Sequence, residues 1–309
     1  MTTVEQKASW ETKDWHELTE EDILAANIKK YEDDHIVGMY DTDSQESSAE
    51  YLEHELFFPI ITQLLKKKSQ SIKAIDICGG GGKASFILHH CGCDVVLLDS
   101  AEKMLDIARN KIQRDGINNM SLVNSDAIAY LRDSTELFDI AVFSSAIHHF
   151  KDPFGLIKLA FDRLSPNGIM VILGEPTPLV SSNRWRRALA FWTFLYDKNY
   201  RRKQIVSIPS RIRGTYIPGP DERDPAEYQA YLGIEDRKLK QQMINAGMQV
   251  MLHIHYPAGG PPFITRMMPL LGLNWVMGMV IGRENDNQLR HRLKEAVQKE
   301  LPYKVDFIP

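Results

Sequence analysis

The pattern of apolar and polar residues changes character near residue 72. Before that point, residues 20–31 and 49–67 place apolar side chains at helical spacing, and the polar, turn-rich residues 41–48 separate these two amphipathic segments. After it, short apolar runs alternate with helical segments. We expect strands at 73–78, 94–99, 121–124, 138–144 and 169–173, with helices at 83–91, 101–115, 127–132 and 153–164 between them. Repeated strand–helix units with largely apolar strands predict a parallel sheet that helices cover on both faces.

The regular alternation ends after residue 175. Residues 176–235 are rich in Pro, Arg and aromatic residues and show no strand–helix rhythm, so we interpret them as an inserted cap. Next we expect a helix at 235–246, strands at 248–256 and 275–282, a candidate lid within the long apolar connection 257–274, and a surface helix at 287–301. The predicted organisation is an N-terminal helical lid (1–70), a core (71–175), the cap (176–235) and a C-terminal part that completes the core (236–309).

Composition adds limits on location and partners. The 309 residues carry a net charge of −4, which gives no general attraction to nucleic acid or to anionic membranes. Three cysteines are too few for a disulfide framework, and the polar first 22 residues do not resemble a secretory signal. The longest apolar run, 267–282, is short and is interrupted by Pro269 and Asn274. We therefore expect a cytoplasmic protein with no transmembrane segment.

The strongest local feature is a run of four glycines, Gly79 to Gly82, between the first predicted strand and its helix. Glycines let the backbone adopt positive φ and approach a ligand closely, and the following helix offers free N–H groups to a negative group. Such a loop serves dinucleotides, nucleotide phosphates or S-adenosylmethionine, or forms a tight turn without a ligand. Asp99 narrows these alternatives, because it ends the second strand at the same edge of the sheet and can accept hydrogen bonds from both hydroxyls of a ribose.

In these motifs the chain resembles the class I S-adenosylmethionine-dependent methyltransferases, particularly their small-molecule branch. Asp76, Gly80 and Gly82 match the family's first motif, and Cys78 stands where its first glycine is usual. Residues 98–105 are similar to the second motif, 124–127 to the segment that meets the adenine amino group, and 138–150 to the fourth motif and its following loop. The matches keep the family's order and spacing over about a hundred residues.

The resemblance implies a fold, a cofactor and a set of binding residues. The implied fold is α/β: a Rossmann-like, doubly wound, mostly parallel sheet with a C-terminal antiparallel strand pair, plus helical N-terminal and inserted cap elements. The implied cofactor is S-adenosyl-L-methionine. Its binding residues would be Asp76, Gly79, Gly80, Gly82, Asp99, Ser100, Met104, Asp126, Ala127 and Ser144. A dinucleotide-dependent dehydrogenase is the nearest alternative, but no Tyr-x-x-x-Lys follows the fourth strand.

Methyl transfer from a sulfonium is an in-line displacement, so the protein mainly positions the acceptor and excludes water. A general base is needed only where the attacking atom must lose a proton. His148, His149 and Glu175 are the candidates, with His149 preferred by analogy, although each of them is equally compatible with a structural role. We expect no metal, because His253 and His255 share one strand face without a carboxylate nearby in the sequence.

The charge pattern bears on the acceptor. Residues 184–213 hold nine Lys or Arg, interleaved with aromatic residues, whereas residues 1–55 hold many acids and only four Lys. The basic segment is compatible with a pocket for an anionic, partly apolar small molecule, with an RNA-facing or membrane-surface element, or with docking of the acidic N-terminal segment. A small-molecule acceptor is favoured, and nucleic acid is disfavoured by the net charge. An RNA or protein methyltransferase and a non-catalytic cofactor-binding protein remain alternatives, and the sequence indicates no oligomeric state.

Overall fold

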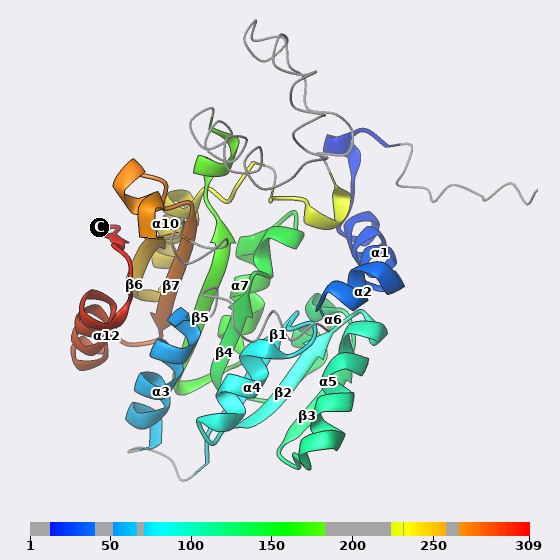
Figure 1. Cartoon of the computed structure of the whole chain (residues 1–309), viewed down its shortest axis with the longest axis horizontal. Coiled ribbons are helices and arrows are strands. Elements are labelled where there is room, and N and C mark those ends of the chain that lie inside the picture. The colour runs from blue at the N-terminus through cyan, green and yellow to red at the C-terminus, as the bar shows by residue number, and fades with distance from the viewer. Residues whose placement is uncertain (1–12, 41–51, 67–70, 183–223, 231, 258–265) are drawn as a thin grey trace, which may run out of the picture.

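A single mixed sheet forms the centre of the protein (Figure 1). The computed structural model describes residues 13–40, 52–66, 71–182, 224–230, 232–257 and 266–309. Within them lie strands β1 (Lys73–Ile77), β2 (Asp94–Asp99), β3 (Met120–Asn124), β4 (Phe138–Ser144), β5 (Leu164–Pro176), β6 (Gln249–Tyr256), β7 (Val276–Gly282) and β8 (Asp306–Phe307). The order is β3-β2-β1-β4-β5-β7-β6-β8, with β1 to β5 parallel. Because β7 runs antiparallel to both β5 and β6, the predicted fold class is confirmed.

Helices cover both faces of the sheet. The α-helices are α1 (Glu20–Tyr31), α2 (Asp34–Tyr40), α3 (Leu52–Lys66), α4 (Lys83–His90), α5 (Glu102–Asp115), α6 (Ala127–Asp133), α7 (Pro153–Asp162), α10 (Asp236–Asn245) and α12 (Asn287–Glu300). Helices α3, α4, α5 and α12 pack on one face, and α6, α7 and α10 pack on the other. Successive strand residues supply the two faces in turn: Val171 joins the first cluster, whereas Met170 and Ile172 join the second.

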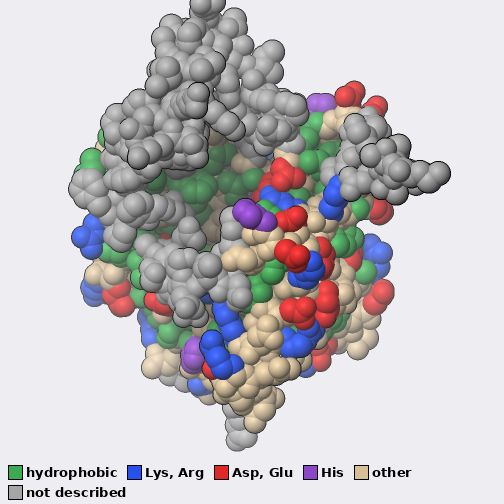
Figure 2. All heavy atoms as spheres, turned by 45° about the vertical axis from the view of Figure 1, so that its right-hand side comes forward, with side chains coloured by type: hydrophobic (Ala, Val, Ile, Leu, Met, Phe, Trp, Pro, Cys, Tyr) green, Lys and Arg blue, Asp and Glu red, His purple; other side chains and the backbone are tan. Residues whose placement is uncertain are grey.

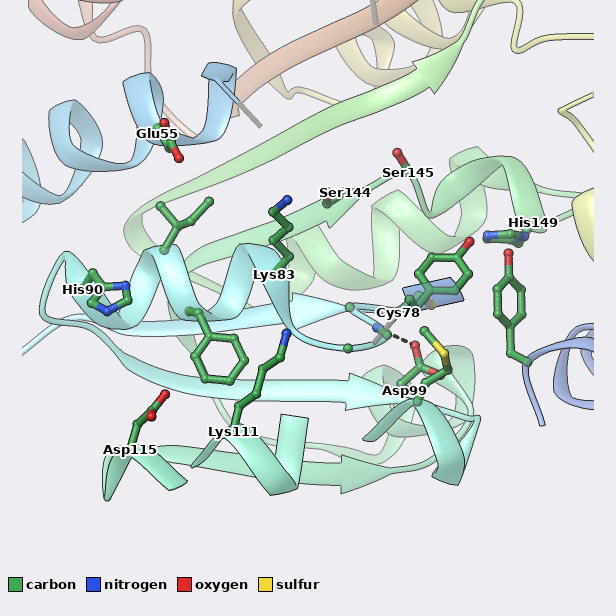
Figure 3. Close-up of a pocket in the computed structure, with 18 of the residues that line it drawn as sticks. Glu55, Cys78, Lys83, His90, Asp99, Lys111, Asp115, Ser144, Ser145 and His149 are labelled. Carbon is green, nitrogen blue, oxygen red and sulfur yellow. Dashed lines mark hydrogen bonds between the residues drawn. The ribbon is translucent and has the colours of Figure 1, made fainter. Parts of the chain in front are cut away.

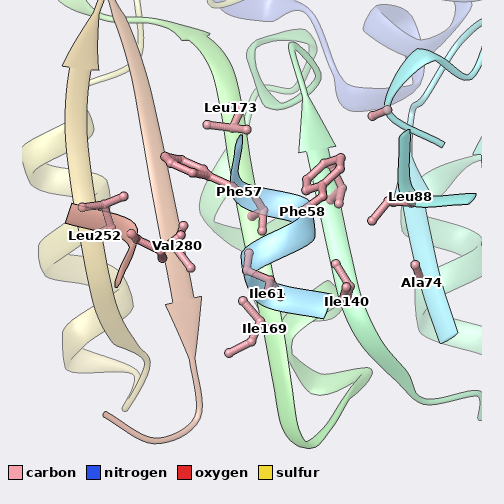
Figure 4. Close-up of a cluster of buried hydrophobic side chains, with 14 of the residues drawn as sticks. Phe57, Phe58, Ile61, Ala74, Leu88, Ile140, Ile169, Leu173, Leu252 and Val280 are labelled. Atoms are coloured by element: carbon pink, nitrogen blue, oxygen red, sulfur yellow. The ribbon is translucent and has the colours of Figure 1, made fainter. Parts of the chain in front are cut away.

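Helix α3 is the central element of the first face. Its side chains Phe57, Phe58 and Ile61 are fully buried, and Figure 4 shows them lying against Ile140 of β4 and Leu173 of β5. This helix covers the middle of the sheet because its apolar residues recur every three or four positions. It also carries His54 to the edge of the site described below.

The expected elements differ from the observed ones mainly at their ends. Strand β5 begins at Leu164 and runs through residues 166–168, ahead of the strand expected at 169–173, with a register shift between Phe138 and Ile140 of its neighbour β4. Short elements were missed: α2 and β8, and 3-10 turns that include η5 (Ile147–His149) and η8 (Pro225–Glu227). They are too short to show a periodic pattern. Of the expected lid at 257–274, residues 258–265 lie outside the described residues.

The sheet topology fixes where a ligand can bind. The chain proceeds from β1 outward to β3 and then returns to β4 on the other side of β1, so the strand order reverses between β1 and β4. In open α/β sheets the crevice beyond the strand ends at such a reversal is the usual ligand site. Helices α1 and α2 cover this edge, because Tyr31, Val37 and Tyr40 pack on Met104 and Ile107 of α5. Among the described helices, none is both long and apolar enough to cross a membrane.

Candidate active site

The loop between β1 and α4 has a tightly constrained backbone. Cys78, Gly80 and Gly82 all have positive φ, of 57°, 54° and 81°. Gly79 has no room for a side chain, since a Cβ there would lie 2.5 Å from Asp76 Oδ2 and would also meet Leu97. The loop therefore exposes its backbone to the crevice, and Gly82 begins α4 as its N-cap.

Asp99 is hydrogen-bonded to this loop. Its Oδ2 accepts a hydrogen bond of 2.8 Å from the Gly80 N–H, and its Oδ1 accepts one of 2.9 Å from the Ala101 N–H at the start of α5. Burial raises the pKa of the carboxyl, and the backbone N–H donors partly oppose that shift. Each carboxylate oxygen can accept a further hydrogen bond, so Asp99 can still bind hydroxyl donors from the crevice.

Asp76 lies behind the loop rather than in the wall of the crevice. The side chain is fully buried, and its Oδ2 accepts hydrogen bonds from the backbone N–H and hydroxyl of Ser85, at 3.0 and 2.7 Å. Burial raises the pKa of this carboxyl to about 6 against the lowering effect of Ser85. Its Oδ1 has no hydrogen-bond partner among the described residues. Asp76 thus holds the first turn of α4 under the loop.

Two neighbouring cavities lie at this edge, of about 500 and about 310 Å³. The larger is lined by Gly79, Gly80, Met104, Ser144 and the lid residues Tyr31 and Tyr40; the smaller is lined by Ser100, Asp126 and Ala127. Four residues line both: Asn27, Cys78, Asp99 and His149. Figure 3 shows Asp99, Cys78 and His149 at one end of the larger cavity, with Lys83 and Ser144 farther along it. All predicted cofactor-binding residues except Asp76 and Gly82 line one cavity or the other.

His148 and Glu175 form a buried pair next to the cavity. Glu175 is fully buried and accepts hydrogen bonds from the backbone N–H groups of residues 146, 147 and 148, at 2.6, 2.9 and 3.2 Å. Its Oε2 also lies 2.8 Å from His148 Nδ1, and the other ring nitrogen, Nε2, lies 2.9 Å from Glu227 Oε2. Burial alone would lower the pKa of His148, but the two carboxylates outweigh it and raise the pKa to about 9. His148 is therefore a cation at neutral pH, with both nitrogens engaged.

His149 has the opposite protonation state: its ring is neutral. Its Nδ1 lies 2.6 Å from the Ala226 carbonyl oxygen, which can only accept, so Nδ1 carries the proton and Nε2 carries the lone pair. Burial and the adjacent His148 cation both lower the pKa of His149, which keeps the ring neutral. A neutral imidazole in the cavity wall can accept a proton. The structure thus distinguishes two histidines between which the sequence gave only a preference by analogy for His149, and Glu175 is engaged by backbone N–H groups and by His148.

Glu227 connects His148 to helix α1. Its Oε1 lies 2.9 Å from Lys30 Nζ and 2.7 Å from the Tyr31 hydroxyl, both on α1. The His148 hydrogen bond and nearby cations hold its pKa well below the usual range despite burial, so it stays ionised. Lys30 also pairs with Asp224 at 2.8 Å. These contacts join helix α1 to the end of the predicted cap. The sequence suggested an acidic N-terminal segment docking on a basic cap, but here α1 supplies the cation, Lys30, and the cap end supplies the carboxylates. The basic segment 184–213 lies outside the described residues.

Ser144 has a partner that the sequence did not indicate. His54 Nε2 of α3 lies 2.9 Å from Ser144 Oγ. Complete burial lowers the pKa of His54 to about 3, so this ring is neutral as well. Sequence reasoning missed His54, Tyr31 and Glu227, because each is far along the chain from the motifs and belongs to no local pattern.

Two groups of histidines and carboxylates in the described residues have ligand atoms within 4.8 Å of one another. The first is His148, His149 and Glu227, in which both nitrogens of His148 are already engaged by carboxylates. The second is Asp236, His253 and His255. The sequence suggested no carboxylate near the last two, and that premise was wrong, since the fold brings Asp236 from α10 to within 3 Å of both rings.

The known proteins that resemble this chain are methyltransferases. A family model described as a methyltransferase domain matches residues 48–211, more than half of the chain. The ubiquinone biosynthesis O-methyltransferase of Ruegeria pomeroyi is 28% identical over 101 residues, 32% of this chain and 40% of that protein. The uncharacterized methyltransferase YbaJ of Bacillus subtilis is 27% identical over 144 residues, 46% of this chain and 50% of that protein. The chain thus spans half or less of the length of these relatives.

A solved structure shares the fold over a longer stretch. The magnesium protoporphyrin IX methyltransferase ChlM from Synechocystis PCC 6803, with bound SAH, has a TM-score of 0.52 and 11% identity, and the match covers 85% of this chain and 100% of that one. At this identity the likeness concerns the arrangement of the sheet and helices.

Proposed function

This chain belongs to the family of methyltransferase domains, and we propose that it transfers the methyl group of S-adenosylmethionine to a hydroxyl of a small organic acceptor. The class I resemblance of its motifs is thereby confirmed. The observation that carries the proposal is the meeting of Asp99, Cys78 and His149 where the two cavities adjoin. A carboxylate suited to a ribose and a neutral histidine suited to a proton then face the same space.

The crevice suits S-adenosylmethionine in shape and donor set. Gly79 and Gly80 leave backbone where a side chain would narrow the crevice, and a Cβ on Gly80 would approach Met104 Cε to 3.1 Å. Asp99 would hold the ribose, while Ser100, Met104, Asp126 and Ala127 would surround the adenine, partly within the smaller cavity. Buried Asp76, whose Oδ1 has no hydrogen-bond partner within the described part of the chain, leaves negative character under the loop, which favours an ammonium group. Bound SAH in ChlM supports this assignment.

The cofactor supplies a methyl group already activated by its sulfonium. The protein must hold the acceptor in line, keep water out and remove a proton. His149 Nε2 would take the acceptor's hydroxyl proton, and the Ala226 carbonyl would hold the ring in the tautomer that leaves Nε2 free. Tyr31 and Tyr40 of the lid would cover the reacting atoms. The His148 cation would not serve as the base, because Glu175 and Glu227 bind both of its nitrogens.

The cavity wall favours a partly apolar acceptor. Phe86 and Ile87 supply apolar surface to the larger cavity, and its charges are mixed, because Lys83 and Lys111 lie along it together with Glu55 and Asp115 (Figure 3). The O-methyltransferase among the relatives supports oxygen as the accepting atom. On the face drawn in Figure 2, the described Lys, Arg, Asp and Glu side chains are interspersed rather than gathered into a basic stretch.

The cofactor assignment is tested by calorimetry with S-adenosylhomocysteine on the full chain. We expect the wild type to bind, and Asp99→Ala to weaken the dissociation constant by at least about tenfold, because a hydrogen bond to a charged group contributes about 1.5–3 kcal/mol. Asp106→Ala, at an exposed position of the following helix α5, is the matched control and should leave affinity unchanged.

Two results would contradict the assignments. If the wild type has no affinity for S-adenosylhomocysteine, the proposed function is wrong. An unchanged dissociation constant in Asp99→Ala would remove only the ribose assignment. The acceptor is then sought by measuring S-adenosylhomocysteine release during incubation with fractionated small-molecule extracts.

A further inference from the structure

A second cluster of polar side chains lies away from the crevice, between α10 and β6. Asp236 opens the first turn of α10, and His253 and His255 lie on the face of β6 that α10 covers. Both ring Nε2 atoms approach the same oxygen, Asp236 Oδ2, at 2.9 Å for His253 and 2.8 Å for His255. Three potential metal-ligand atoms from two elements thus converge on one point.

His253 is poorly satisfied as an ordinary core residue. It is only 4% exposed, and neither of its ring nitrogens has a hydrogen-bond partner among the described residues. Its Nε2 is close to Asp236 Oδ2 but is not aligned for a hydrogen bond. Leaving a buried polar atom unpaired costs stability, so a buried imidazole aimed at a carboxylate without a hydrogen bond calls for another partner.

We propose that Asp236, His253 and His255 form a binding site for a divalent transition metal of the zinc type. Two imidazole nitrogens and one carboxylate oxygen are a ligand set that such ions prefer over Ca²⁺ or Mg²⁺. The ligand atoms lie within 4.8 Å of one another, so small side-chain rotations bring all three to a common ion. His255 remains partly exposed, which leaves access for the ion and for a water ligand.

The group at the crevice is a weaker competitor for the same ion. There, His148 has Glu175 on Nδ1 and Glu227 on Nε2, so it offers no free lone pair. His149 donates from Nδ1 to a backbone carbonyl, which leaves a single imidazole nitrogen and one carboxylate. At the α10–β6 site each Nε2 meets only Asp236, which would itself be a ligand, whereas His148 is held by a carboxylate on each nitrogen, so we expect zinc to fill the α10–β6 site first.

An ion at this position would fix the start of α10 on β6. The residues just before Asp236 also contact β5, because the Ile234 N–H donates to the Pro176 carbonyl at 2.7 Å. The metal would therefore hold the C-terminal strand pair and α10 as one unit beside the end of β5. This role is structural and does not depend on the methyltransferase proposal.

The test is a zinc titration of the full chain after treatment with a chelator, in competition with a chromophoric zinc indicator. We expect one tight equivalent in the wild type, and at least about a tenfold loss of affinity in Asp236→Asn and in His255→Gln. His291→Gln, at an exposed position of α12, is the matched control and should bind as the wild type does. Asp236→Asn keeps the size of the side chain, so it provides the result if His255→Gln folds poorly.

Further outcomes distinguish the two histidine groups. Cobalt in place of zinc should give visible ligand-field absorption in the wild type that disappears in the Asp236→Asn, His255→Gln double variant. Zinc binding that survives in this double variant, or that is lost in His149→Gln instead, would overturn the proposal. A wild type that binds no zinc would overturn it too.

Discussion

Cys78 stands in the glycine loop with a φ of 57°, a left-handed conformation that L side chains rarely adopt. The family's usual glycine would adopt it without strain, whereas a residue with a Cβ loses about 1–2 kcal/mol there. The cost is tolerated because the loop is held on one side by Asp99 through Gly80 and on the other by the first turn of α4.

The strain can be measured by comparing two variants. Cys78→Gly and Cys78→Ala both remove the thiol, but only glycine removes the strain. We expect the glycine variant to be more stable than the alanine variant by about 1 kcal/mol in urea unfolding, after allowing for the greater backbone freedom of unfolded glycine. Equal stabilities would show that the loop stores no strain at this residue.

His149 should determine the pH dependence of activity if it is the base. We expect His149→Gln to lower kcat by about 10²-fold or more, while affinity for S-adenosylhomocysteine stays near that of the wild type. Because the pKa of His149 is lowered from its usual 6.5, the ring stays neutral in mildly acidic solution. The acidic limb of the kcat/KM profile should therefore lie below pH 6.5. A limb above that value, or a fully active His149→Gln, would exclude this role.

At the scale of elements, two glycines in the loop between β1 and α4 differ in the space available for a side chain. A Cβ on Gly79 would overlap Asp76 and Leu97, while one on Gly81 would reach only 3.4 Å from Ile107 Cγ2, an ordinary contact, and Gly81 has no positive φ. The sequence shows four adjacent glycines with no difference between them, so only the packing under the loop shows that a Cβ at Gly79 would overlap buried side chains.

This difference predicts unequal effects of one substitution. Gly79→Ala should destabilise the fold by roughly 1–3 kcal/mol, because the new methyl group forces buried neighbours apart. Gly81→Ala should change stability by less than about 1 kcal/mol, since alanine fits and reduces the freedom of the unfolded chain. Thermal unfolding of both variants beside the wild type provides the measurement, and equal losses would contradict the packing argument.

At the scale of the whole molecule, one charged network joins the lid, the cap end and the core. Lys30 and Tyr31 of α1 contact Glu227 of η8, which contacts His148 of η5, which contacts Glu175 of β5. The cation in the middle is a histidine, so this connection between distant elements responds to pH.

The network should make stability fall in mildly alkaline solution. The pKa of His148 rises from 6.5 to about 9 on folding, so its contribution is complete below pH 6.5 and is lost as the pH rises through about 9. We expect the free energy of unfolding to decrease by roughly 3 kcal/mol over that interval. His148→Gln should be less stable at pH 6.5 and should lack this decrease, whereas His35→Gln, at an exposed position of α2, should retain it. A wild type whose stability is constant across the interval would contradict the charged state of His148.

Much of the fold is determined by the sequence alone. Strands β2 and β4 and helix α1 have the expected bounds, because their apolar spacing and their end signals are local. The same holds for the approach of Asp99 to the glycine loop, since parallel strands bring the residues at their ends to one edge.

Only the tertiary structure decided what the side chains do. The sequence could not assign roles to His148 and His149, because their difference depends on Glu227 and on the Ala226 carbonyl, nearly eighty residues away. The sequence likewise did not indicate that Asp236 lies next to His253 and His255. Strand and helix periodicity is a local property of the chain, whereas protonation and ligand geometry depend on charges and donors that arrive from distant segments when the chain packs.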